Sequence, residues 1–516
     1  MHNSKSINEM NNLLLLLGKK IGWSLLVTII TIGYLYENSK ATCTASSNLQ
    51  LEESEPLQIL MITGGGPWHN YDIQKDQIYN GLMERLSNIE ITIDYEGEDT
   101  NTMASTDFFF SRHLQEDWAA DFDVVIYNHC NLQVKDEDYV KGIVAQHVKH
   151  QVPAVMLHCP MHLYQYAEGD APNVWWDFTG AVSYYHEKEN HPNTSPYTIE
   201  VLAYNHPILK NYPRSWRTPK GELYLIVELN ENAMPLTHAY SVETHSYHET
   251  AWINEYDGVK VFSSTLGHHD ESMGSDVNLN LIASGVLWAT DKLQDDGSPV
   301  TGFEGERGLG WISLWDDEGS LNGWVESGGV MDWTSSPWYG REIVWPTIDS
   351  TAVGESFRLD NDNLIVEGDA RNLFYDGRIA GGYFKNFEFK VDVFTYPEST
   401  SGIYFHTRYR EEGEPAFGYK AQINGSRDGE SKTGSLVHAS ELTNAPHEDN
   451  EWFTYYIKVD GNDIQIKVDG DVVNEYTQPS DTAGPASLNW GTIGIESAGS
   501  DNRVYFRNPM IRLLPD

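Results

Sequence analysis

The chain has few basic residues for its length. Of its 516 residues, 34 are Lys or Arg and 76 are Asp or Glu, which gives a formal net charge of −42 at pH 7. Nucleic-acid binding depends on basic contacts to phosphates, and anionic membrane surfaces attract basic segments. The charge therefore excludes both as partners, and it favours neutral glycans over anionic ones.

Cysteine is also scarce. Three cysteines are too few for the disulfide framework of a small secreted domain. Cys43 lies near the N-terminus, which leaves Cys130 and Cys159 for the folded part. Both follow apolar runs, so a disulfide between them can form in an oxidising compartment. Cys159 is not expected to be a nucleophile, because Leu157 and Met161 occupy the positions where a nucleophile elbow has glycine.

A long apolar run occurs only near the N-terminus. Lys19 and Lys20 precede apolar residues 21–35, a stretch with the length of a signal-peptide core and short for a membrane span. We therefore predict export to the periplasm, the cell surface or the medium. Cleavage of the segment and membrane anchoring through residues 21–36 both remain open. Residues 1–55 would then be the targeting segment and a tether.

The length calls for at least two domains. From residue 56 to 291, apolar runs that are typical of buried strands alternate with helical periodicity. We expect strands at 57–63, 89–95, 122–127, 153–157 and 259–265, and helices at 78–86, 136–150 and 277–290. This alternation predicts an α/β domain with a doubly wound parallel sheet. Polar residues 292–308 read as a linker.

Histidines follow several of these expected strands. Ligands of doubly wound sheets bind outside the carboxyl ends of the strands. We therefore predict a pocket that binds a sugar or a divalent metal, the metal being unknown. Structural or surface histidines are the alternative. The histidines at these strand ends are His69, His129, His158, His162, His268 and His269, of which His69, His158, His162 and His268 are the predicted substrate-binding residues.

Several segments of this first domain resemble the ThuA (trehalose utilisation) family. They are the glycine-rich turn that ends in His69, and residues 158–162, 205–208, 222–224 and 266–268. The resemblance implies a fold like that of class I glutamine amidotransferases, without their catalytic cysteine. It also implies an association with sugar catabolism.

In residues 309–516 the helical periodicity of the first domain disappears. Short alternating strands separated by Gly, Asn and Asp turns predict an all-β sandwich or jelly roll. Around residues 401–424, alternation places Ile403 and Phe405 on one face and a polar set on the other. The expected polar set, which suits a sugar, is Tyr404, His406, Arg408, Arg410, Lys420, Gln422 and Asn424. A solvated outer face is the alternative.

The same domain resembles the 3-keto-disaccharide hydrolase family. The segments that carry the resemblance are residues 310–315, 321–324, 383–389, 401–403, 418–423, 433–434, 451–452 and 504–508. The resemblance implies a concanavalin-like jelly roll that cleaves glycosides oxidised at C3. Other members are expected to serve only as binding domains.

Such cleavage needs a general base near C2 and a donor for the developing enolate oxygen. We predict His406 as the base and Arg408 as the oxyanion partner. Tyr404, Tyr419 and Gln422 are the predicted substrate-binding residues. Where the family usually has Gln-x-His-Gly, this chain has Glu496-Ser-Ala-Gly. Glu496 is therefore an alternative catalytic base, unless the change at Ala498 has removed the activity.

Together these observations predict an exported protein of carbohydrate catabolism that acts as a hydrolase or lyase on 3-keto-glycosides. Two alternatives stay open. One is a non-catalytic glycan-binding protein, and the other is a ThuA-type sugar enzyme, with or without a divalent metal, that uses the jelly roll as its binding module. The sugar, its linkage and the oligomeric state are not predicted.

Overall fold

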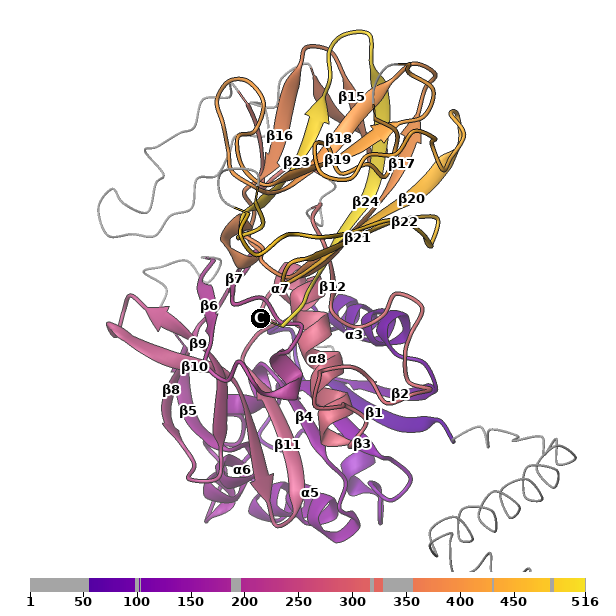
Figure 1. The fold of residues 1–516 in the computed structure, drawn as a ribbon. Helices are drawn as coiled ribbons and strands as arrows, with labels where there is room; N and C mark the ends of the chain where they lie inside the picture. The colour runs from indigo at the N-terminus through magenta and orange to yellow at the C-terminus, as the bar shows by residue number, and fades with distance from the viewer. Residues whose placement is uncertain are drawn as a thin grey trace, which may run out of the picture. The chain divides into compact units, whose positions relative to one another are not determined.

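The computed structural model describes residues 55–97, 102, 104–186, 196–315, 320–327, 356–428, 431–482 and 487–515. The apolar segment at residues 21–36 and Cys43 lie outside these ranges. Within them, no helix is long and apolar enough to cross a membrane. An α/β domain is followed by an all-β sandwich (Figure 1), which confirms the predicted fold classes.

The α/β domain is built on a nine-stranded sheet. Its parallel half has the flavodoxin-like order β2-β1-β3-β4-β11. In sheets of this order, ligands bind outside the carboxyl ends of the strands. An antiparallel half, which the sequence did not predict, continues the sheet through β10, β9, β6 and β7. The strands are β1 (Leu57–Gly64), β2 (Ile89–Glu96), β3 (Val124–His129), β4 (Ala154–Leu157), β6 (Thr198–Val201), β7 (Ser215–Arg217), β9 (Met234–Ser241), β10 (Ser246–Tyr256) and β11 (Val259–Ser264).

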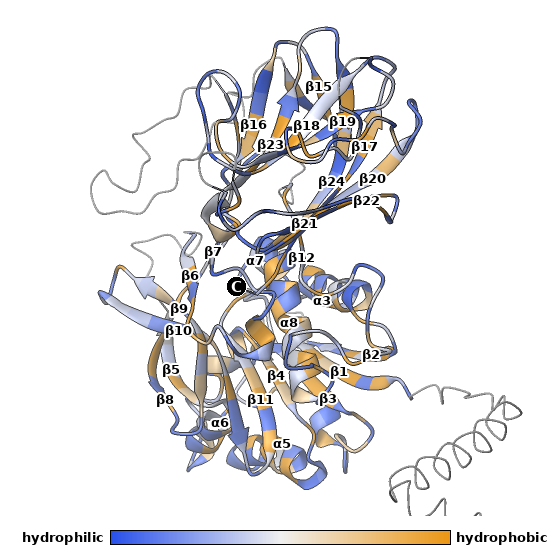
Figure 2. Ribbon diagram, in the orientation of Figure 1, coloured by the Kyte–Doolittle hydropathy of each residue, from blue (hydrophilic) through white to orange (hydrophobic). Residues whose placement is uncertain are grey.

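Helices cover both faces of this sheet. α3 (Tyr71–Arg85) and α8 (Asp276–Ala289) pack with Ile59 and Met61 of β1, whereas α5 (Glu137–His150) and α6 (Ala171–Thr179) pack with Leu60 and Ile62. Because alternate residues of β1 are buried on opposite faces, the strand is mostly apolar (Figure 2), and its polar residues Gln58 and Thr63 lie near its ends. The short α7 (Asp270–Met273) precedes α8, and a two-stranded sheet pairs β5 (Ala181–His186) with β8 (Tyr224–Leu229).

Residues 292–308, predicted to be a linker, are ordered along the C-terminal end of α3. The carbonyl of Phe303 accepts a hydrogen bond from the backbone N–H of Ser87, and the N–H of Gly305 donates to the carbonyl of Arg85. Phe303 is buried in the core that α3 and α8 share. The predicted linker therefore packs against the α/β domain.

The all-β domain consists of two packed sheets. One has the order β14-β15-β24-β17-β20-β21-β22, with β12 paired to β24, and the other has the order β13-β16-β23-β18-β19. Alternate apolar residues from both sheets, such as Phe389, Ile403 and Ile495, share one core. The strands are β12 (Trp311–Ser313), β13 (Trp324–Glu326), β14 (Phe357–Asp360), β15 (Asn363–Glu367), β16 (Arg371–Tyr375), β17 (Phe387–Thr395), β18 (Thr400–Thr407), β19 (Tyr419–Asn424), β20 (Trp452–Asp460), β21 (Asp463–Val468), β22 (Asp471–Thr477), β23 (Thr492–Ser497) and β24 (Arg503–Leu513).

The alternation of β18 is broken near its C-terminal end. The register between β18 and β23 shifts between Tyr404 and Thr407, and His406 adopts a left-handed backbone conformation with φ 54°. A bulge of this kind redirects a side chain. The strict alternation that placed His406 beside Tyr404 on the polar face is therefore wrong at this position.

Candidate functional site

Three of the strand-end histidines lie together. His69 follows β1, His158 follows β4 and His268 follows β11, and these strands end at the same edge of the sheet. The ring centroids are 4.8 Å apart for His69 and His158, 4.7 Å for His69 and His268, and 5.4 Å for His158 and His268. His158 has φ 62°, a strained conformation for a residue with a side chain, and such strain is concentrated at functional sites.

Glu222 completes this cluster, which we call the histidine centre (His69, His158, Glu222 and His268). Its Oε2 atom lies 3.2 Å from Nε2 of His158 and 3.0 Å from Nδ1 of His268, and the residue is buried. Burial opposes its ionisation, but the hydrogen bonds with His158 and His268 outweigh burial and hold the pKa of Glu222 well below its usual value. Glu222 was part of a recognised motif but was not predicted as a site residue.

Backbone carbonyls fix the tautomers of two rings. Nδ1 of His158 donates to the carbonyl of Thr265 at 2.7 Å, and Nδ1 of His69 donates to the carbonyl of His268 at 3.2 Å. Burial lowers the pKa of both imidazoles. Nε2 of His158 is the ring nitrogen that faces Glu222.

His162 lies next to the centre. Its ring stacks on Tyr224 with the centroids 4.8 Å apart, and the Tyr224 hydroxyl lies 3.4 Å from its Nε2 atom and 3.2 Å from Nε2 of His158. His129, at the end of β3, is instead buried against Phe110, and burial lowers its pKa to about 3. The structure thus separates His129 from the other strand-end histidines.

A disulfide joins Cys130 and Cys159, which confirms the predicted pairing. It ties together the ends of β3 and β4, close to His69 of the histidine centre. His69 and the two sulfur atoms lie within metal-binding distance of one another. Because the sulfurs are bonded to each other, however, neither is a thiolate, the form of cysteine that binds metals.

The second constellation lies on the polar face of the smaller sheet. Nζ of Lys420 lies 2.7 Å from Oε1 of Glu496, and the Tyr404 hydroxyl lies 3.5 Å from the same oxygen. The Tyr404 hydroxyl also donates to Glu414. Burial, together with Glu496 and Glu414, raises the pKa of Tyr404 well above its usual value, so its phenol keeps its proton. We call Tyr404, Lys420 and Glu496 the platform.

This platform contains a base, a cation and a proton donor. Tyr404 and Glu496 are buried, Lys420 is about one-fifth exposed and Glu414 is exposed. A ligand can therefore approach from the side of Lys420 and Glu414. Electrostatic interactions are strengthened at such a partly dry site.

His406, the predicted base, lies elsewhere. Its Nε2 atom donates to the carbonyl of Lys385 at 2.7 Å, and its Nδ1 atom accepts from the backbone N–H of Asn489 at 3.1 Å. Burial lowers its pKa to about 4. Both ring nitrogens hold backbone segments in place, an arrangement that favours a structural role over that of a base.

The other predicted residues of this domain are also accounted for. Arg408 is exposed and stacks on Phe417 and Trp490, with its guanidinium carbon 5.0 Å and 5.3 Å from the ring centroids. Gln422 donates to Oγ1 of Thr400. Tyr419 stacks on Phe405 in the core, and its hydroxyl donates to Gln478. Only Tyr404 and Glu496 of the predicted set meet on the platform.

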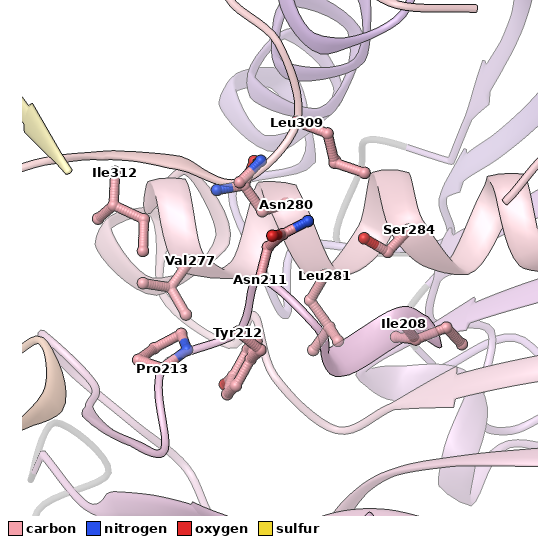
Figure 3. Close-up of a pocket in the computed structure, with 11 residues that line it drawn as sticks. Ile208, Asn211, Tyr212, Pro213, Val277, Asn280, Leu281, Ser284, Leu309 and Ile312 are labelled. Carbon is pink, nitrogen blue, oxygen red and sulfur yellow. The ribbon is translucent and has the colours of Figure 1, made fainter. Parts of the chain in front are cut away.

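A separate cavity lies along α8 (Figure 3). Apolar side chains form most of its wall, and the amide of Asn280 is already bonded to Arg85 and to the backbone of residues 310 and 311. It is lined by Ile208, Asn211, Tyr212, Pro213, Val277, Asn280, Leu281, Ser284, Leu309, Gly310 and Ile312. None of these residues belongs to the histidine centre or the platform.

Two family models match the chain. Residues 72–289 match the model described as trehalose utilisation (ThuA), and residues 310–512 match the model of a 3-keto-alpha-glucoside-1,2-lyase-like domain. The fusion predicted from the two resemblances is confirmed. Both descriptions concern carbohydrates, which makes a carbohydrate-related function the common element. No curated protein matches the chain.

Several solved structures are each similar to part of the chain. A putative ThuA-like protein from Parabacteroides merdae shares 17% identity and a TM-score of 0.35, with 49% of this chain and 98% of that chain covered. A putative glycosyl hydrolase from Parabacteroides distasonis shares 15% identity and a TM-score of 0.30, over 40% and 94% of the two chains. The carbohydrate-binding module CBM66 from Bacillus subtilis shares 12% identity and a TM-score of 0.25, over 37% and 96%.

Proposed function

We propose that the chain is an exported enzyme of carbohydrate catabolism that cleaves glycosides oxidised at C3, because residues 72–289 match the trehalose utilisation model and residues 310–512 match the model of a 3-keto-alpha-glucoside-1,2-lyase-like domain. The observation that carries the proposal is the convergence of Tyr404, Lys420 and Glu496 on one face of the sandwich. The Cys130–Cys159 disulfide supports export, because such bonds persist in oxidising compartments.

The platform offers the groups that an elimination requires. A ketone at C3 acidifies the hydrogen at C2, and the carboxylate of Glu496 is the base that removes it. The ammonium group of Lys420 stabilises the enolate oxygen that forms at C3. When the enolate collapses, its electron pair forms the C1–C2 double bond and expels the substituent at C1. Tyr404, which keeps its proton, donates it to the departing oxygen.

Water addition across the new double bond completes a net hydrolysis, whereas release of the unsaturated sugar makes the reaction that of a lyase. Either outcome begins with the same proton abstraction at C2. Glu496 takes the role of base because His406 is engaged with the backbone of Lys385 and Asn489.

The test follows aglycone release by the full chain from a 3-keto-glucoside and from its unoxidised parent. We expect release from the keto form alone. Glu496→Gln should lower the rate about 100- to 10,000-fold, the usual contribution of a general base. His406→Gln, which keeps one donor and one acceptor, should leave the rate of the folded protein nearly unchanged.

His268→Gln is the matched control in the other domain, and it should not slow aglycone release. Loss of release in His268→Gln, with Glu496→Gln still active, would assign the chemistry to the α/β domain. Release from neither substrate would reject the lyase proposal.

A second candidate function is glycan binding without turnover. The observation in its favour is a group of half-exposed aromatic residues, Tyr383, Phe417 and Trp490, with Arg408 stacked between the last two. Exposed aromatic faces suit the apolar faces of sugar rings. Trp490→Ala should then weaken binding of a neutral oligosaccharide by up to about 10-fold, with no aglycone release in either protein.

A further inference from the structure

We propose that the histidine centre of the α/β domain binds one divalent transition-metal ion of the zinc class, with His69, His158 and His268 as nitrogen ligands and Glu222 as the oxygen ligand. The proposal does not depend on the lyase function, because the centre and the platform share no residue. It adds a second site, in the domain for which the elimination gives no role.

Spacing is the first argument. In a tetrahedral zinc site with bonds of 2.0–2.2 Å, neighbouring ligand atoms lie about 3.4 Å apart. Oε2 of Glu222 lies 3.2 Å from Nε2 of His158 and 3.0 Å from Nδ1 of His268, which is close to that spacing. Ligand atoms of the three histidines all lie within 4.8 Å of one another.

The second argument is the orientation of the rings. Metal-binding histidines commonly donate their other ring nitrogen to a carbonyl or carboxylate, which fixes the tautomer and aims the ligating nitrogen. His158 does so through Thr265, and His69 does so through the carbonyl of His268. The His268 carbonyl is held in turn by Gln74, whose amide also donates to the carbonyl of Gly267.

The donor set selects the class of metal. Three imidazoles and one carboxylate suit zinc and its neighbours in the first transition series, whereas magnesium and calcium prefer oxygen ligands. The nearby sulfur atoms do not compete while Cys130 and Cys159 remain joined. When bound, such an ion polarises a sugar carbonyl or activates water.

The test measures zinc bound by the full chain after chelator treatment and re-addition of zinc, and repeats it for variants. We expect about one zinc per chain. His69→Gln and His158→Gln should weaken binding by at least about 100-fold, and Glu222→Gln by about 10- to 100-fold. His238→Gln, which alters a histidine on β9 outside the centre, should bind as the parent does.

Cobalt substitution guards against variants that merely unfold. The parent with Co²⁺ should show the intense visible bands of tetrahedral cobalt. Glu222→Gln keeps the size and shape of the side chain. It should alter these bands while the circular dichroism of the protein stays unchanged. The same titration under reducing conditions tests the alternative set of His69, Cys130 and Cys159.

Three results would overturn the proposal. They are absence of zinc binding in the oxidised parent, binding that appears only after the disulfide is reduced, and parent-like affinity in His158→Gln. None of them bears on aglycone release by the platform, so the two proposals fail separately.

Discussion

Lys420 on β19 reaches Glu496 on β23 by crossing the strand that lies between them, β18, at Gly402. The order of the sheet is β23-β18-β19, and Gly402 is the direct cross-strand partner of Gln422, two residues along β19 from Lys420. A Cβ atom at Gly402 would lie 2.4 Å from Cε of Lys420. The absence of a side chain at this position is therefore what allows the 2.7 Å contact between Lys420 and Glu496.

Gly402→Ala tests this relationship. Gly402 has no left-handed backbone conformation, so alanine fits the strand and only the methyl group is at issue. The methyl group should push Lys420 off Glu496 and slow aglycone release about 10-fold or more, in line with the value of one aimed oxyanion donor. The measurement is kcat with a 3-keto-glucoside. An unchanged kcat in a folded variant would show that Lys420 is not required in this position.

Lys420→Met tests the platform as a buried ion pair. Removing the ammonium group leaves the carboxylate of Glu496 in a site that is 5% exposed. Loss of one partner of a buried pair typically costs about 3–5 kcal/mol, and the lower end applies because Lys420 is partly exposed. Adding Glu496→Gln to Lys420→Met should recover part of that loss. Denaturant unfolding, monitored by circular dichroism, measures the stability of the single and the double variant. A double variant less stable than Lys420→Met would contradict the pairing.

Much of the α/β domain could be predicted because buried parallel strands are apolar runs. The strand predicted at residues 122–127 is β3 at Val124–His129, and the helix predicted at 136–150 is α5 at Glu137–His150. The rule that parallel strands end at one edge also anticipates the meeting of His69, His158 and His268. The antiparallel strands β6, β7, β9 and β10 carry mixed polar and apolar residues, and no comparable run marks them.

The incorrect or missing predictions of site residues have local structural causes. Glu222 reaches the histidine centre from just before β8, a strand outside the main sheet, so no strand-end rule points to it. His406 lies away from the platform because β18 has a bulge there, and nothing in the sequence from Tyr404 to Thr407 indicates a left-handed backbone conformation. Glycine or asparagine would have signalled that conformation, and histidine does so only weakly.

Stability should fall as the pH drops from about 6.5 towards 4. Burial lowers the pKa of His147 and of His406 from the ordinary 6.5 to about 4, and it lowers that of His129 to about 3. Between these values the unfolded chain binds protons that the folded chain does not, so each residue removes up to about 1.4 kcal/mol of stability per pH unit. Asp376 acts in the opposite sense between 3.8 and 6, because burial raises its pKa to about 6.

The net effect of these three histidines against one aspartate is a loss of stability in acid. Thermal unfolding at pH 7, 6 and 5 measures it. His406→Gln should reduce the slope with pH, whereas His245→Gln, at an exposed turn, should not. A slope that is the same in His406→Gln as in the parent would contradict the buried, neutral state of His406.

Reduction of the Cys130–Cys159 disulfide should destabilise the α/β domain. The bond closes a loop with a sequence separation of 29, and removing such a crosslink releases chain entropy worth about 3–4 kcal/mol in the unfolded state. The Cys130→Ser/Cys159→Ser variant should therefore unfold at a lower temperature, and added thiol should have no further effect on it. Thiol reagents should lower the midpoint of the parent to that of the variant.

The serine variant also tests the metal ligands, because the two sulfur atoms lie close to His69. Zinc binding in the oxidised parent and in this variant should be alike if the nitrogen and oxygen ligands of the histidine centre hold the metal. A much tighter affinity in the reduced parent than in the serine variant would instead make the two cysteines part of the metal site.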